Sequence, residues 1–112
     1  MTELIKGTEA AVLLTLGEID GCNAYQYEWK VELYTHPNNR VTLNWDDCSP
    51  KEYADLADRP EGKLEFYVPL DSDELGVGEV TADIIAFIPD PLFKDGHRTE
   101  IVRIESIATI IP

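Results

Sequence analysis

The sequence has few cysteines, few basic residues and no long hydrophobic run. Its 112 residues include two cysteines and one methionine, and nine Lys and Arg stand against 22 Asp and Glu, for a net charge of −13. This charge repels nucleic-acid phosphates and anionic membranes, which argues against both as partners. No segment approaches the roughly 20 apolar residues that span a bilayer. We expect the acidity to serve solubility, with a basic partner or Ca²⁺ as the alternative explanation.

The two cysteines and the first residues bear on the compartment. Residues 1–6 lack the basic start and the long apolar run of a signal peptide, so we expect synthesis in the cytoplasm. In that compartment Cys22 and Cys48 are expected to be reduced thiols, although a bridge between them is geometrically allowed. Their separation matches no pattern of paired zinc ligands. We therefore predict no bound metal and no cofactor.

The clearest pattern in the chain is the alternation of apolar and polar residues over positions 25–33 (YQYEWKVEL). A period of two places Tyr25, Tyr27, Trp29, Val31 and Leu33 on one face of a strand. The other face is polar, as in a half-buried antiparallel strand. This pattern belongs to a strand predicted over residues 24–35, and five more strands are predicted over residues 8–16, 40–45, 63–70, 79–88 and 99–111, the last with a bulge near Ser106.

These strands, without alternating helices, predict the fold class. We expect one all-β domain over residues 1–112, an antiparallel two-layer β-sandwich of immunoglobulin-like topology with six or seven strands. A small barrel is the alternative. Ser49-Pro50-Lys51-Glu52 has the form of a capping box, which predicts a short helical insert near residues 50–57. Residues 71–78 and 89–97 are predicted loops, the second reversing at Asp95-Gly96.

No residues form a recognisable catalytic motif, so we predict no enzyme activity. His36 and His97 stand beside turns without placed partners. The loop DSDE at residues 71–74 carries three carboxylates, but its spacing is not that of a calcium loop, and we expect it to be a solvated loop.

Two groups of residues are candidates for binding. Tyr34 stands on the polar face of its strand, and with Tyr67, Ile85 and Phe87 it is predicted to form an apolar interface patch, unless the insert or the loop before His97 covers it. A second group suits a carbohydrate or small ligand at one end of the sandwich: Trp45, Asp46, Asp47 and Tyr53. A glycosidase would need two of these carboxylates at a fixed separation, which the sequence does not define.

The chain as a whole resembles the N-terminal immunoglobulin-like β-sandwich modules of phage and prophage baseplate or tail-fibre proteins. The resemblance lies in LIKGT at residues 4–8, the turn ending at Asp20-Gly21, LGVGEVTADI at 75–84, IPDPLFKDGHR at 88–98 and EIV at 100–102. Modules of this kind usually continue into a stalk or receptor-binding domain, whereas this sequence ends at Pro112. The motifs concern turns and glycines and carry over no catalytic residue.

The resemblance implies a structural or assembly module of a phage or prophage particle, which acts through contacts with other protein subunits, including copies of itself. The alternative is a β-sandwich that binds carbohydrate or another small ligand. A small enzyme or metal-binding protein is the third hypothesis, and it would require a histidine beside carboxylates in a pocket.

Overall fold

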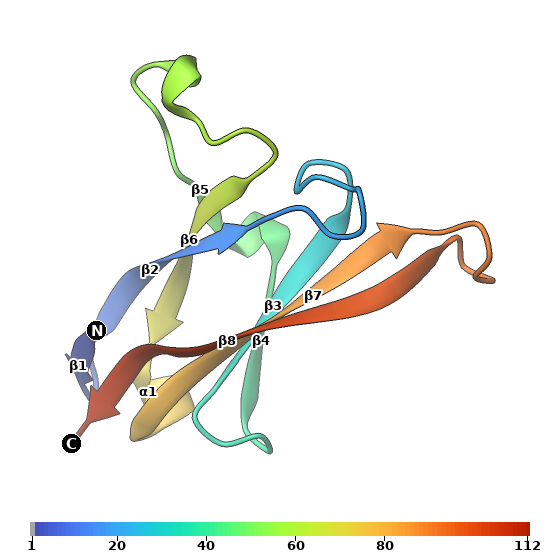
Figure 1. Ribbon diagram of the computed structural model, residues 1–112. Helices are drawn as coiled ribbons and strands as arrows, with labels where there is room; N and C mark the ends of the chain where they lie inside the picture. The colour runs from blue at the N-terminus through green and yellow to red at the C-terminus, as the bar shows by residue number, and fades with distance from the viewer. Residues whose placement is uncertain (1) are drawn as a thin grey trace.

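The computed structural model describes residues 2–112 as two β-sheets packed face to face (Figure 1). The larger sheet has the strand order β1-β8-β7-β3-β4 and the smaller one β2-β6-β5. The strands are β1 (Glu3–Ile5), β2 (Glu9–Leu16), β3 (Glu28–Tyr34), β4 (Arg40–Asn44), β5 (Ser49–Pro50), β6 (Leu64–Asp71), β7 (Gly78–Pro89) and β8 (His97–Ile111). Three short helical segments complete the chain: η1 (Trp45–Asp47), η2 (Leu56–Asp58) and α1 (Ser72–Leu75).

The alternation of residues 25–33 builds the centre of the core. Trp29, Val31 and Leu33 of β3 are buried and point toward the smaller sheet, while Glu28, Lys30 and Glu32 point the other way. The ring of Trp29 packs on that of Phe66 in β6, with 4.4 Å between the ring centres. This contact joins the two layers. Tyr25 lies before β3 and is half exposed, so the strand begins three residues later than the pattern suggested.

Strand β7 is the central strand of the larger sheet, between β8 and β3. Its alternate residues Val80, Ala82, Ile84, Ala86 and Ile88 are all buried, as predicted. The predicted bulge is confirmed in β8. Val80 pairs with Ala108 and Ala82 with Ile104, so Thr81 faces three residues, and Ser106 takes a left-handed φ of 54°.

The predicted capping box at Ser49 is wrong. Ser49 and Pro50 form β5 and pair with Tyr67 and Phe66, and the Lys51 amide donates to the Glu65 carbonyl at 2.9 Å. Pairing to a neighbouring strand satisfies these backbone groups better than an isolated turn of helix. The only helical part of this insert is η2, where the Asp55 carboxylate accepts from the Ala57 amide at 2.9 Å.

The predicted loop at residues 71–78 contains a single turn of helix, α1. Asp71 caps it by accepting from the Asp73 amide at 3.0 Å. Ser72 is fully buried because its hydroxyl accepts from the Gly7 amide and donates to the Thr8 carbonyl. Leu75 is buried and is the apolar anchor that the sequence predicted.

The all-β class is therefore correct, while the strand count was underestimated. Residues 2–112 form eight strands, and the two that the sequence did not predict are β1, with three residues, and β5, with two. Strand β1 runs parallel to β8, so the larger sheet is not purely antiparallel. Among residues 2–112, none of the helical segments has the length and hydropathy to cross a bilayer.

The contact between Trp29 and Phe66 predicts a large loss of stability on truncation. Phe66 is 1% exposed, so we expect Phe66→Ala to lower the free energy of unfolding by about 3–5 kcal/mol, from lost burial and the cavity left behind. Leu56→Ala is the control, because Leu56 is 79% exposed, and we expect a change within about 0.5 kcal/mol. Urea unfolding followed by tryptophan fluorescence measures both. Equal losses would mean that the two sheets are not joined at Phe66.

Candidate functional site

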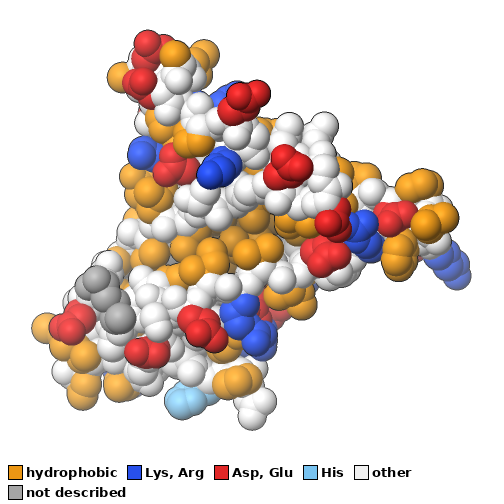
Figure 2. Space-filling model, viewed as in Figure 1, with side chains coloured by type: hydrophobic (Ala, Val, Ile, Leu, Met, Phe, Trp, Pro, Cys, Tyr) orange, Lys and Arg blue, Asp and Glu red, His pale blue; other side chains and the backbone are white. Residues whose placement is uncertain are grey.

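The turn between β7 and β8 projects away from the other strands (Figure 1). Leu92 and Phe93 lie in this turn, with exposed fractions of 90% and 49%. Figure 2 shows hydrophobic side chains at the end of the projection, with charged side chains beside them. Two adjacent large apolar residues at the tip of a projecting hairpin are costly to hydrate and are available for contact.

Polar contacts hold the base of this projection. The Arg98 guanidinium donates to the carboxylates of Asp90, at 3.1 Å, and Glu100, at 3.2 Å, and also pairs with Asp20. Within the turn, the Asp90 amide donates to the Gly96 carbonyl at 2.9 Å, and Gly96 has the positive φ that the predicted reversal requires. Asp20 lies in the loop that connects β2 of the smaller sheet to β3 of the larger sheet. Its ion pair with Arg98 therefore links the hairpin to that loop. The tip is therefore held in place.

A second polar group occupies the outer face of the larger sheet. Asp83 of β7 is 1% exposed, yet it points away from the core. Arg103 of β8 donates to it with two nitrogens, at 2.8 and 3.1 Å, and Arg40 of β4 donates at 2.9 Å. The Tyr34 hydroxyl donates at 3.2 Å, and Arg40 also stacks 4.1 Å from the centre of the Tyr34 ring. We name Asp83, Arg40, Arg103 and Tyr34 the Asp83 cluster.

The Asp83 cluster keeps its carboxylate ionised. Hydrogen bonds from Arg103 contribute most to holding the pKa of Asp83 below its ordinary value, with Arg40 and Tyr34 adding to the effect and burial opposing it. A carboxylate that already accepts from two guanidinium groups is a poor proton acceptor. The cluster therefore joins four strands of the sheet, β3, β4, β7 and β8, and is unsuited to acid–base chemistry.

The four residues of the predicted interface patch are not brought together. Tyr34 and Ile85 are buried, Tyr34 beneath Arg40 and within the Asp83 cluster. Phe87 is half-buried and packs edge-on against His97, 5.3 Å between ring centres. Tyr67 is on the outer face of the smaller sheet, on the other side of the molecule. The apolar residue most exposed beside Ile85 is its β8 neighbour Ile101, at 58%.

The predicted ligand residues divide between two neighbouring hollows. Trp45 and Asp46 line a hollow of about 250 Å³ together with Trp29, Cys48 and Phe66. Tyr53 lines another, and its hydroxyl donates to Glu65. Asp47 turns back to the chain, where its carboxylate accepts from the Asn44 amide at 3.0 Å. Trp45 is 61% exposed and Asp46 beside it is exposed too, so these two residues are available to a ligand.

The two cysteines are free thiols. Burial, and then the charges of Asp47 and Asp46, raise the pKa of the Cys48 thiol to about 11. A thiol with so high a pKa carries almost no thiolate at neutral pH and is a weak nucleophile. Within residues 2–112, no three or more His, Cys, Asp or Glu side chains are grouped so that they could hold a metal ion.

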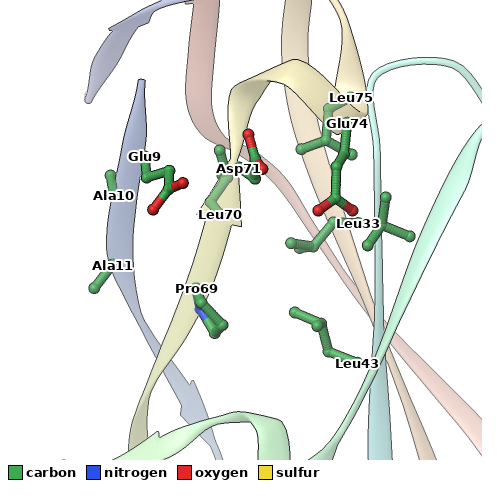
Figure 3. Close-up of a pocket in the computed structure, with 11 residues that line it drawn as sticks. Glu9, Ala10, Ala11, Leu33, Leu43, Pro69, Leu70, Asp71, Glu74 and Leu75 are labelled. Atoms are coloured by element: carbon green, nitrogen blue, oxygen red, sulfur yellow. The ribbon is translucent and has the colours of Figure 1, made fainter. Parts of the chain in front are cut away.

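A further cavity, which was not among the predicted sites, lies between the open edges of the two sheets (Figure 3). It has a volume of about 420 Å³ and lies between Leu33, Val41 and Leu43 of the larger sheet and Pro69 to Asp71 of β6. The cavity exists because β5 pairs with β6 only at Phe66 and Tyr67. Next to Pro69 and the residues that follow it, no strand of the smaller sheet lies opposite β4. The carboxylates of Glu9 and Glu74 lie at its mouth, and Figure 3 shows that of Glu74 pointing toward Leu33.

Pro69 was the one sequence signal for this opening. The backbone carbonyl of Glu65 points toward β5. In an antiparallel ladder the backbone groups of alternate residues point to the same side, so those of Tyr67 and Pro69 also point toward the β5 side. Proline has no amide hydrogen to donate, and it is found where a strand has no neighbour on that side. Its position therefore marks where the pairing with β5 ends.

Comparison with protein-family models, with curated proteins and with solved structures finds no match to this chain. The argument for function accordingly depends on the arrangement of the chain's own residues. Among the described residues, Leu92 and Phe93 at the hairpin tip are the one pair of exposed large apolar residues that are consecutive in the chain.

The Asp83 cluster predicts a pH-dependent contribution to stability. We expect Asp83→Asn to lower the free energy of unfolding at pH 7 by about 1.5–3 kcal/mol, the usual range for hydrogen bonds to a charged group. Because the folded-state pKa is depressed, the native advantage is complete above the unfolded value of about 3.9 and disappears as the pH falls through the folded value. Urea unfolding between pH 7 and pH 2.5 checks this.

Asp95→Asn is the matched control for that series, because Asp95 is exposed in the hairpin turn. We expect it to change stability by less than about 0.5 kcal/mol at every pH. If Asp83→Asn and the native protein kept a constant difference down to pH 2.5, the carboxylate would not be what stabilises the cluster.

Proposed function

We propose that this chain is a non-enzymatic structural or assembly module of a phage or prophage particle, and that it acts through protein–protein contacts. The observation that carries this proposal is the hairpin tip, where Leu92 and Phe93 are presented to solvent on a base fixed by Arg98. Exposed apolar groups on a held projection are characteristic of contact surfaces. In this proposal the chain is made in the cytoplasm and then incorporated into the particle.

The same proposal takes the sandwich to be immunoglobulin-like. Supporting it is the strand order, because variable-type immunoglobulin domains face a sheet of strands G, F, C and C′ with one that contains B, E and D. Here β8-β7-β3-β4 faces β2-β6-β5 in the corresponding order of the chain. Trp29 is buried on β3, the counterpart of strand C, where such domains carry a core tryptophan. The free thiols Cys22 and Cys48 depart from the disulfide-bridged members.

This reading also gives the hairpin tip a role. In variable-type domains the loop between strands F and G is one of the binding loops at the end of the sandwich. The turn of residues 90–96, between β7 and β8, occupies that place. The tip is thus where a module of this architecture would make its contact, and its apolar side chains fit a protein surface better than a charged or sugar ligand.

The proposal predicts co-purification with particles. In the strain that encodes it, we expect the tagged chain to sediment with purified phage particles, and Leu92→Asp to release it, with a loss of about 2 kcal/mol or more in binding, roughly 30-fold. Leu56→Asp is the control, since Leu56 is similarly exposed on a different projection. Absence of the native chain from the particle fractions would overturn the assembly role.

A carbohydrate- or small-ligand-binding module is the second candidate, and exposed Trp45 favours it. The indole is 61% exposed and borders the hollow of about 250 Å³ that also reaches Asp46. A sugar stacking on that ring would bury it, as aromatic faces do in such sites. The 420 Å³ cavity beside Glu74 is an apolar alternative for a small ligand.

The ligand-binding candidate predicts a fluorescence change. Titration with a panel of oligosaccharides should shift the tryptophan emission of the native protein to the blue and leave that of Trp45→Phe unchanged, since Trp29 is already buried. We expect dissociation constants of about 1 mM or tighter if the site is used. No shift with any sugar, in a protein that remains folded, would dismiss this candidate.

A further inference from the structure

Strand β2 is an edge strand with unused backbone groups. It pairs only with β6, at the end of the smaller sheet. The backbone groups of the odd-numbered residues of β6 point toward β5, so those of its even-numbered residues point toward β2. There they pair with the backbone of Ala10, Val12, Leu14 and Leu16. The amide and carbonyl groups of the alternate β2 residues therefore point outward along the free edge, and these residues are Glu9, Ala11, Leu13 and Thr15.

This edge lacks the protection that natural edges carry. Proteins shield edges by keeping them short, or with charges, proline and bulges. The other edges of the described sheets follow this rule: β1 has three residues, β5 has two and includes Pro50, and β4 has five and begins with Arg40. Strand β2 has eight residues, and its only charge is Glu9, at its first position. It is the long, unprotected edge of the molecule.

The inner surface next to this edge is also incompletely covered. The larger sheet has five strands and the smaller sheet three, so the end of the larger sheet at β8 and β1 extends beyond β2. Val12 of β2 and Val102, Ile104 and Ile107 of β8 are packed against the core but only partly buried. Figure 2 shows hydrophobic side chains gathered along the seam between β2 and β8. One more strand beside β2 would cover them.

We propose that β2 pairs antiparallel with β2 of a second copy of this chain, so that two three-stranded sheets become one continuous six-stranded sheet. A twofold axis at Val12 places Ala11 opposite Leu13 and Glu9 opposite Thr15 of the second copy. All four outward-facing residues then exchange backbone hydrogen bonds with each other. The inference rests on the proposed assembly role, because it names a partner for it, but it uses a different surface from the hairpin tip.

The side chains of β2 suit this register. Residues that meet across an antiparallel pair must lie on the same face, and here Ala10 meets Leu14 and Val12 meets Val12 on the core side. On the outer side Ala11 meets Leu13, and neither Glu9 meets a like charge. The partner that fits is one with an uncharged, alternating apolar strand, and β2 itself is such a strand. The twofold arrangement also closes, which prevents growth into fibres.

The net charge of −13 opposes association of two copies, so the proposed dimer should depend on salt concentration. Because the contact consists of backbone hydrogen bonds and apolar side chains, salt removes the repulsion without weakening the contact. The Debye length falls from about 10 Å at 0.1 M to about 3 Å at 1 M. Sedimentation velocity over a wide concentration range should show a monomer–dimer equilibrium whose dimer fraction rises with NaCl. A monomer at all concentrations and salts overturns the proposal.

A pair of variants locates the contact. Leu13→Lys places a charge on the free edge, and we expect it to weaken the dimer about tenfold or more. Tyr67→Lys is the matched control: Tyr67 is the cross-strand neighbour of Leu13 on the same outer face, 37% against 39% exposed, but its strand is not an edge. We expect it to leave the dimer unchanged. Equal effects of the two would place the contact on the sheet face and overturn the edge pairing.

Cross-linking tests the register through the formation of a new bond, whereas the variants above test the contact through a loss of dimer affinity. Opposed residues of a hydrogen-bonded pair have Cα atoms about 5.5 Å apart, which suits a disulfide. In a Cys22→Ser background, a mixture of Ala11→Cys and Leu13→Cys should form cross-linked dimers faster than either variant alone. Equal rates in all three would overturn the register. Leu92→Asp should still dimerise, so a failed dimer and a failed hairpin contact are told apart.

Discussion

The packing of β3 and β7 against β6 is the constraint on which the rest of the structure depends. A chain of this length must bury most of its apolar side chains in one core, and it does so by placing alternate residues of these strands face to face across the two sheets. Trp29 packs on Phe66 across the two layers. The strand edges and the β7–β8 hairpin stay exposed because they lie outside this packed core.

The unequal width of the two sheets follows from the same constraint. Five strands are held together by β7 and β8, the two longest, while the smaller sheet has only β2, β6 and a two-residue β5. The smaller sheet cannot cover the larger one at both ends. At the β4 end this leaves the cavity beside Glu74, and at the β8 end it leaves the seam next to β2. Both openings are consequences of topology rather than defects of packing.

Much of the fold was predictable because the alternation of apolar residues directly encodes burial. The strand positions, the bulge near Ser106 and the buried Leu75 follow from periodicity and glycine placement. The helix expected at Ser49 did not form, because a capping box is a local signal and pairing with β6 is not. Strands β1 and β5 are too short to show any periodicity.

The candidate sites were less predictable, since they depend on which strands become neighbours. Tyr34 was expected to be exposed because its strand face is otherwise polar. It is covered because β4 and β7 bring Arg40 and Asp83 to it, from six residues away in one case and 49 in the other. Asp83 looked like an ordinary polar residue on an outward face. No pattern in the sequence around Asp83 indicates that two arginines from different strands donate hydrogen bonds to its carboxylate.

Charge explains why the exposed surfaces differ in kind. An acidic chain is kept apart from its own copies and from anionic surfaces by long-range repulsion, so a contact with such a partner must come from neutral, short-range groups. Two places that offer such groups are the hairpin tip, with Leu92 and Phe93, and the β2 edge between Ala10 and Leu16. They lie on different elements and use different forces, side-chain burial at the tip and backbone hydrogen bonding at the edge. In the two proposals made above, the module joins a copy of itself along one side, and its hairpin remains free for a different protein.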